Sequence, residues 1–122
     1  MDIINKYYEN GNIKCQYYYD NGELHRLDGP AQISYYDNGN IEGEYYYLNN
    51  KRHRLDKPAQ ILYYKSGNIE EEYYFVNDDY HRQNGPSYIA YNENGNVVNK
   101  EYWLNNVKYN ELEYLLAISN LK

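Results

Sequence analysis

Three short segments of this chain combine a histidine with an arginine and, three residues after the histidine, an acid or its amide. They begin His25-Arg26-Leu27-Asp28, His53-Arg54-Leu55-Asp56 and His81-Arg82-Gln83-Asn84. A histidine beside a carboxylate can act as a general base that the acid orients. Three histidines brought together can also hold a metal ion such as zinc. General base catalysis and metal binding are therefore the two chemistries to weigh first.

The spacing of the three segments weakens both hypotheses. The segments begin at residues 25, 53 and 81, at a constant interval of 28 residues. A fixed period of this length is typical of repeat proteins. Each candidate residue then recurs along an array, so we expect a row of equivalent turns rather than one catalytic pocket.

A hydrolase would also need a nucleophile or a positioned water beside the histidine. No serine or cysteine recurs there: the counterparts of Ser34 are Leu62 and Ala90, and that of Cys15 is Gly43. The alternative is structural. The acid or amide shapes the turn before the proline, and the arginine pairs with a glutamate or stacks on a tyrosine. We favour this alternative and expect a protein that is not an enzyme.

A metal site is also disfavoured by the geometry of an array. Zinc ligands converge to about 2.0–2.1 Å from one ion. Equivalent residues separated by two strands of a sheet lie roughly 10 Å apart. Each separate segment offers one histidine and at most one aspartate. We therefore expect no metal and no cofactor.

Four units account for the chain between its ends: residues 7–34, 35–62, 63–90 and 91–118. Each opens with aromatic residues followed closely by a turn sequence such as Asn-Gly-Asn, at Asn10, Asn38, Ser66 and Asn94. Asn-Gly between apolar segments predicts a β-hairpin with a type I′ turn, in which both central residues have positive φ.

Each turn leads into a strand rich in acids and tyrosine, clearest at residues 41–48. Tyr18, Tyr46, Tyr74 and Tyr102 are identical in every unit, and we expect their face of the sheet to be the better buried one. The next column stays aromatic as Tyr19, Tyr47, Phe75 and Trp103, which indicates packing. A second turn, the histidine segment and a proline at the start of another strand complete the unit.

The fourth unit ends differently. Tyr109 and Asn110 replace the histidine and arginine, and leucines at 112, 115, 116 and 121 follow at near-helical spacing. Asn110 with Glu113 three residues on is typical of a capping box. We predict a short amphipathic helix over residues 111–120, which caps the last edge of the array. The predicted fold is mainly β, one domain over residues 1–122: an antiparallel β-hairpin repeat meander, or solenoid, with a C-terminal capping helix.

Composition limits the classes of partner. The 122 residues include 20 tyrosines and carry a net charge of −6. This charge argues against nucleic acid and against an anionic membrane surface, both of which need clustered basic residues. The single Cys15 excludes an internal disulfide framework. Because residues 1–6 have no apolar stretch typical of a signal peptide, we expect a soluble cytoplasmic protein.

The pieces Tyr-Tyr-x-Asn-Gly, Glu-x-Tyr-Tyr and Asn-Gly or Asn-Asn ahead of the histidine resemble a variant of the membrane-occupation-and-recognition-nexus (MORN) repeat. The unit ending His-Arg-Leu-Asp-Gly-Pro-Ala resembles repeats common in uncharacterised proteins of large DNA viruses and bacteriophages. The resemblance covers residues 7–109. It implies consecutive β-hairpins and a viral interaction protein in the host cytoplasm. Standard MORN repeats are shorter and carry glycine where this chain has Arg26, Arg54 and Arg82.

We therefore predict a non-enzymatic protein-protein interaction module, with a host protein or a second copy of the chain as partner. Self-association would use the N-terminal edge near Ile3 and Ile4. The alternative is a glycan or a small polar ligand bound on a tyrosine-rich face. The candidate binding residues are His25, Arg26, His53, Arg54, His81, Arg82, Tyr18, Tyr46, Tyr74 and Tyr102.

Overall fold

The structure is a computed structural model that describes residues 1–121. Its elements in chain order are β1 (Asp2–Tyr7), β2 (Ile13–Asp20), β3 (Glu23–Leu24), β4 (Gln32–Tyr35), β5 (Ile41–Tyr45), β6 (Tyr47–Leu48), β7 (Lys51–Arg52), β8 (Gln60–Tyr63), β9 (Ile69–Tyr73), β10 (Phe75–Val76), β11 (Asp79–Tyr80), β12 (Tyr88–Tyr91), β13 (Val97–Leu104), β14 (Val107–Tyr109) and α1 (Glu111–Ser119).

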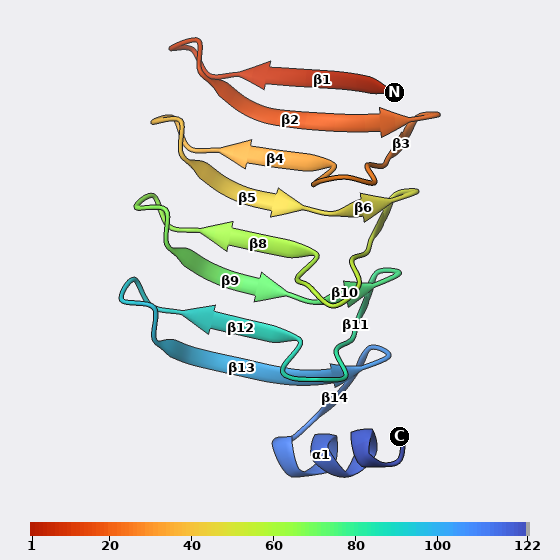
Figure 1. Cartoon of the computed structure of the whole chain (residues 1–122). Helices are drawn as coiled ribbons and strands as arrows, with labels where there is room; N and C mark the ends of the chain where they lie inside the picture. Colours follow the sequence, from red (N-terminus) through yellow and green to blue (C-terminus); the bar gives the residue numbers. More distant parts are fainter. Residues whose placement is uncertain (122) are drawn as a thin grey trace.

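The strands form an antiparallel meander. The main sheet runs in the order β1-β2-β4-β5-β8-β9-β12-β13-β14 with β3 beside β2, and β6-β7 and β10-β11 form two small sheets. In Figure 1 successive hairpins stack from β1 (red) at one end to β13 and α1 (blue) at the other. The prediction of a mainly β fold with an antiparallel meander and one short C-terminal helix is confirmed.

The strand expected over residues 41–48 is interrupted in its middle. It divides at Tyr46 into β5 and β6, and the next unit divides likewise at Tyr74. The backbone of Tyr46 changes partners at this point: its N–H donates to the carbonyl of Ala59 (2.7 Å), and its carbonyl accepts from the N–H of His53 (3.0 Å). The main sheet therefore ends here, and the small hairpin begins.

The first turn of each unit is not the type I′ turn that Asn-Gly predicts. The N–H of Gly11 donates to the carbonyl of Tyr8 (3.0 Å), and the N–H of Tyr8 donates to the carbonyl of Asn12 (2.8 Å). Gly11 has φ +90°, whereas Asn10 is not among the residues with positive φ. This is a three-residue loop with a glycine bulge. It shifts the register before β2, where Tyr7 pairs with Ile13.

The type I′ pattern occurs at the second turn instead. Both central residues have positive φ in every unit: Asn21 and Gly22, Asn49 and Asn50, Asn77 and Asp78, and Asn105 and Asn106. Asparagine and aspartate tolerate this region better than other residues with a side chain. These two-residue turns close the hairpins at the side of the sheet opposite the first turns (Figure 1).

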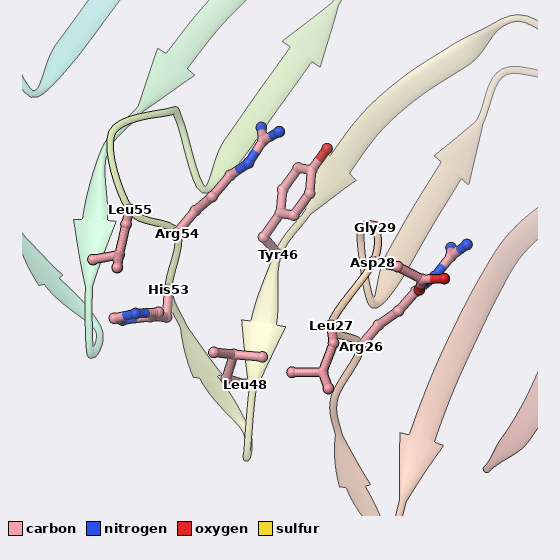
Figure 2. Close-up of a pocket in the computed structure, with 9 residues that line it drawn as sticks. All are labelled: Arg26, Leu27, Asp28, Gly29, Tyr46, Leu48, His53, Arg54 and Leu55. Carbon is pink, nitrogen blue, oxygen red and sulfur yellow. The ribbon is translucent and has the colours of Figure 1, made fainter.

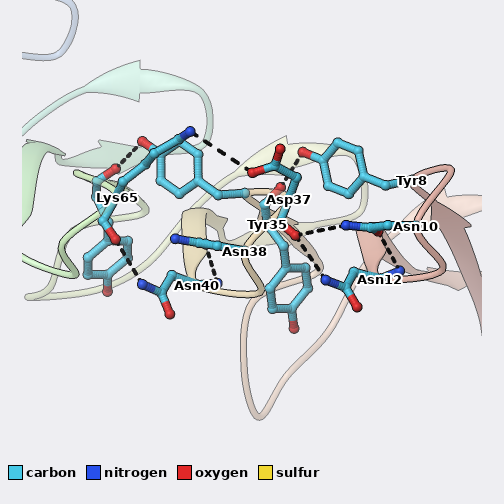
Figure 3. Close-up of polar contacts among 10 residues, drawn as sticks. Tyr8, Asn10, Asn12, Tyr35, Asp37, Asn38, Asn40 and Lys65 are labelled. Carbon is cyan, nitrogen blue, oxygen red and sulfur yellow. Dashed lines mark hydrogen bonds and ion pairs between the residues drawn. The ribbon is translucent and has the colours of Figure 1, made fainter.

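Side-chain hydrogen bonds join each first turn to the next. The hydroxyls of Tyr8, Tyr36 and Tyr64 donate to the carbonyls of Tyr35, Tyr63 and Tyr91, each at 2.6 Å. The amides of Asn12, Asn40 and Asn68 donate to the carbonyls of Asp37, Lys65 and Glu93 at 2.8–2.9 Å. Figure 3 shows this ladder around Tyr8, Asn12 and Asp37. The recurring Tyr-Tyr and Gly-Asn pairs thus hold neighbouring hairpins together.

The core is a thin layer. Ala31, Ala59 and Ser87 have no exposed surface, and Phe75 is 1% exposed. The expected difference between the two tyrosine columns is not found: Tyr74 and Phe75 are both buried, and their counterparts in the other units are all half-buried. Arginines cover one column, while aromatic neighbours and Arg52, whose guanidinium lies 4.0 Å from the Phe75 ring centre, cover the other.

The terminal helix begins as predicted. The Asn110 side chain accepts from the N–H of Glu113 (2.8 Å), and the Glu113 carboxylate accepts from the N–H of Asn110 (3.0 Å), which is a capping box. The face against the sheet is carried by Tyr114, which is 1% exposed, and not by the leucines. Leu112, Leu115 and Leu116 are 51–68% exposed. Among residues 1–121 no helix is both long and apolar enough to cross a membrane.

Alkaline unfolding should accompany tyrosine ionisation. The hydroxyls of Tyr63 and Tyr91 donate to the carboxylates of Glu44 and Glu72 at 2.5 Å. Burial, and then these bonds, raise the pKa of both tyrosines. Unfolded tyrosines ionise near pH 10. Below that pH both states hold these protons, and above it the unfolded state loses them first, so stability should fall as the pH rises.

This pH dependence can be followed by tyrosinate absorbance and circular dichroism in one titration. We expect the tyrosinate absorbance to rise steeply at a pH well above 10, together with loss of the circular dichroism signal of the fold. Glu72→Gln removes the charge opposite Tyr91 and should lower the pKa of that hydroxyl in the folded state. Ionisation of all tyrosines near pH 10 with the fold intact would contradict the prediction.

Candidate functional site in the histidine-arginine loops

The three histidine segments form equivalent loops at one side of the sheet. We call residues 25–30, 53–58 and 81–86 the His-Arg loops; they follow β3, β7 and β11 and precede β4, β8 and β12. Each loop also bonds to the strand of the following unit. The N–H groups of Arg26, Arg54 and Arg82 donate to the carbonyls of Tyr47, Phe75 and Trp103 at 3.2–3.3 Å.

Each histidine is a hydrogen-bond acceptor in this connection. Nδ1 of His25, His53 and His81 accepts from the N–H of Asn49, Asn77 and Asn105 at 2.9–3.0 Å. These asparagines are the first central residues of the type I′ turns one unit further on. The lone pair that a general base would use at Nδ1 is therefore engaged by the backbone, and the ring proton lies on Nε2.

Each arginine covers a tyrosine of its own unit. The guanidinium carbons of Arg26, Arg54 and Arg82 lie 3.9–4.0 Å from the ring centres of Tyr18, Tyr46 and Tyr74. Nη1 of each arginine also donates to the carbonyl of the loop proline at 3.1–3.2 Å. The structure thus arranges nine of the ten candidate residues in three separate groups, each with one histidine, one arginine and one tyrosine. Tyr102, in the unit that lacks the arginine, is covered by the Tyr114 ring at 4.7 Å between centroids.

The middle loop departs from the other two where Lys57 replaces glycine. Nε of Arg26 donates to Asp28 (3.1 Å), and Nε of Arg82 donates to Asn84 (3.2 Å). A Cβ at Gly29 would lie 2.9 Å from the Arg26 guanidinium carbon. In the middle loop Asp56 has positive φ (+63°), unlike its counterparts Asp28 and Asn84, and within residues 1–121 its carboxylate makes no bond to Arg54.

Open grooves lie between successive loops. The first groove, of about 470 Å³, lies between Arg26–Gly29 and His53–Leu55, with Tyr46 and Leu48 at its base. Figure 2 shows Tyr46 beside Arg54 and the two loops on either side. The second groove, of about 490 Å³, lies between Arg54–Asp56 and His81–Asn84, with Tyr74 and Val76 at its base. Grooves of this size between repeated loops suit the binding of side chains.

The chemistry available in the grooves is limited. Their lining includes histidine, arginine, aspartate and tyrosine but no serine, threonine or cysteine. Within residues 1–121 no group of three or more histidine, cysteine, aspartate or glutamate side chains converges on a point that could hold a metal ion.

The most exposed apolar side chains of the loops were absent from the candidate residues. Leu27 is 82% exposed and Leu55 is 67% exposed, and both line grooves. Their position after His-Arg could have identified them, because an apolar side chain in a polar turn does not help to form the turn itself. Tyr114 could not have been identified in this way, since its contact depends on where α1 docks.

Removing one loop arginine should destabilise the protein. Arg54→Ala eliminates the stacking on Tyr46 and the bond to Pro58, and should lower the free energy of unfolding by about 1–3 kcal/mol. Arg54→Lys should restore only part of the lost free energy of unfolding, because an ammonium group lacks the planar shape and the several N–H donors of a guanidinium. Exposed Lys57→Ala in the same loop should change stability by less than about 0.5 kcal/mol. Urea unfolding measures all three, and equal losses for Arg54→Ala and Lys57→Ala would contradict the assignment.

Comparison of the chain with models of protein families, with curated proteins and with solved structures finds no match.

Proposed function

We propose that the chain is a β-hairpin repeat solenoid that acts, without catalysis, as a protein-protein interaction module. The His-Arg loops form its contact surface. The observation that carries this proposal is that the loop side chains fall into two groups, one that makes contacts within the protein and one that is exposed. Histidine side chains bond to the next unit and arginine side chains hold a tyrosine and the loop proline of their own unit, whereas Leu27 and Leu55 line the grooves and are 82% and 67% exposed.

Exposed apolar side chains beside a concave, rigid surface favour a protein partner. Such side chains gain about 25 cal/mol per Å² when a partner covers them, and binding energy concentrates in anchors that enter pockets. Tyr46 and Arg54 in the first groove belong to residue types enriched in such anchors. The net charge of −6 favours a protein over nucleic acid. We place the partner in the cytoplasm, that of the host for a viral chain.

The test is affinity isolation from a lysate with quantitative mass spectrometry. The Leu27→Ser/Leu55→Ser double variant should lose the partner, while its unfolding free energy stays near that of the wild type. Val97→Ser/Val98→Ser is the matched control, because these valines are 54% and 63% exposed at the start of β13, away from the His-Arg loops. Equal retention by both variants would overturn the proposal. Retention of a glycan that Tyr46→Ala abolishes would favour the ligand-binding alternative.

We also propose self-association through β1, on a separate observation. All six residues of β1 are exposed, and its outer edge pairs with no other strand within residues 1–121. The N–H of Tyr18 donates to Ala31, away from β1, so the backbones of Tyr17 and Tyr19 face their partners Ile4 and Asp2. Because the backbone N–H and C=O groups of successive strand residues point to opposite edges, those of Ile3 and Asn5 face the free edge.

This edge is complementary to itself. A second β1 placed antiparallel and centred on Ile4 sets Asp2 opposite Lys6 of the other copy, and Ile3 opposite Asn5. Light scattering should give a dimer at high concentration. Asn5→Pro removes an outward N–H only, so it should give a monomer with an intact fold. A monomeric wild type, or a dimeric Asn5→Pro variant, would contradict self-association at β1.

A further inference from the structure

The helix α1 lies beside the third His-Arg loop, where a third groove would follow the first two. Its Tyr114 hydroxyl donates to the carbonyl of Arg82 (2.5 Å) and accepts from the N–H of Gly85 (3.1 Å). The ring lies against Tyr102, and the helix packs against β13 and β14. Leu104, the counterpart of Leu48 in the fourth unit, is 6% exposed. One tyrosine therefore bridges the two ends of the third loop turn and covers Tyr102.

The first groove carries corresponding residues, with the Arg54 guanidinium over the Tyr46 ring where α1 places an aromatic ring against Tyr102. Arg26 and Gly29 correspond to Arg82 and Gly85, and both line the groove. Within residues 1–121 the Arg26 carbonyl and the Gly29 N–H have no hydrogen-bond partner. Tyr46 corresponds to Tyr102, and Leu48, the counterpart of Leu104, is half-buried rather than buried. The first groove thus offers a donor, an acceptor and an apolar base.

Because its loop contains Gly29, the first groove resembles the turn that Tyr114 contacts more closely than the second groove does. A Cβ at Gly29 or at Gly85 would lie 2.9 Å from the guanidinium of the arginine in the same loop, so in both turns the arginine packs directly against the glycine. The second groove has Lys57 at this place, and its turn carries positive φ on Asp56. An occupant that matches Tyr114 should therefore prefer the first groove to the second.

We infer that the first groove binds a tyrosine side chain of a partner protein, presented on a short helix as α1 presents Tyr114. A hydroxyl is both donor and acceptor, so one oxygen can satisfy the Arg26 carbonyl and the Gly29 N–H together. The phenol ring contacts Leu48 and the part of Tyr46 that Arg54 leaves exposed, and aromatic pairs of this kind add to the burial. This inference rests on the proposed function and names the chemistry of its contact.

The test uses ¹H–¹⁵N spectra of the whole protein titrated with a peptide of residues 110–121. The peptide should shift the Gly29 amide signal in a saturable manner and leave Gly85 unchanged, because Tyr114 already occupies that turn. A matched peptide with phenylalanine for tyrosine should bind about tenfold more weakly, since it lacks both hydrogen bonds. The Tyr114→Ala protein is the reference: the tyrosine peptide should then shift Gly85 as well.

Three results would overturn the inference. They are an unchanged Gly29 signal while Gly85 of Tyr114→Ala responds, equal binding of the two peptides, and no response at either glycine. None of them bears on partner capture by Leu27 and Leu55, so a failure here is distinguishable from failure of the proposed function. If Leu27→Ser/Leu55→Ser retains the partner, the interaction proposal itself fails.

Discussion

Replacing Tyr114 with alanine should lower the free energy of unfolding by about 3–5 kcal/mol, the range for removing a buried aromatic side chain. The ring is 1% exposed, and its hydroxyl bridges Arg82 and Gly85. Because α1 buries no other side chain fully, loss of Tyr114 should also release the helix. Urea unfolding and the helical signal in circular dichroism measure the two effects.

Two further variants separate packing from hydrogen bonding at this position. Tyr114→Phe keeps the ring but leaves the Arg82 carbonyl and the Gly85 N–H unpaired, which should cost about 1–3 kcal/mol. Leu115→Ala is the matched control in the same helix, since Leu115 is 51% exposed. It should change stability by less than about 0.5 kcal/mol. Equal losses for Tyr114→Ala and Leu115→Ala would show that α1 is not docked through Tyr114.

Phe75→Ala should have an effect of similar size, about 3–5 kcal/mol. Phe75 is 1% exposed, with Tyr80 at 4.5 Å between ring centroids and the Arg52 guanidinium 4.0 Å from its own ring centre. Tyr80 in turn stacks on Trp103 at 4.8 Å, so the cluster links the third and fourth units. A cavity at Phe75 should therefore weaken the contact between units as well as the hairpin itself.

Tyr19 supplies the control for Phe75, because it occupies the same column in the first unit. It is half-buried, and among residues 1–121 its ring stacks only on Tyr17, at 6.2 Å between centroids. Tyr19→Ala should cost about 1–2 kcal/mol, in proportion to its smaller burial. Urea unfolding compares the two. A loss at Tyr19 as large as that at Phe75 would mean that position in the column, and not the aromatic cluster, decides the cost.

Much of the fold was predictable because each unit repeats its turns. The Asn-Gly pairs placed the hairpins correctly, although the first turns use a glycine bulge and only the second turns are type I′. Sequence alone could not separate these turns, because both contain Asn-Gly in the first unit. The capping box at Asn110 and Glu113 was correctly predicted, since it depends on residues three apart in the chain.

The roles within the His-Arg loops were only partly predictable. Arginine stacking on tyrosine was one of two structural alternatives, and the rings of Tyr18, Tyr46 and Tyr74 are the ones covered. The bond from Asn49 to His25 joins residues 24 apart, so no local pattern announces it. Tyr114 was also missed, because leucines at helical spacing suggested the wrong buried face.

The loop side chains divide into two groups with different consequences for experiments. Changes at His53 alter the connection to the next unit and changes at Arg54 alter the packing of its own loop, so a lost interaction in such variants would not identify a contact surface. Leu27 and Leu55 can be changed without removing any contact that holds the loops, because most of their surface is exposed. The leucines, rather than the arginines, are therefore the positions at which recognition is best tested.

Site-specific photo-crosslinking can show whether a protein partner binds at the His-Arg loops. Benzoylphenylalanine placed at Leu27 should give a crosslinked protein on irradiation in lysate. At Val97, which is 54% exposed at the start of β13, the same group should give none. Unlabelled wild-type protein should compete the crosslink away. Crosslinking at Val97 with none at Leu27, or no competable crosslink at Leu27, would contradict the account.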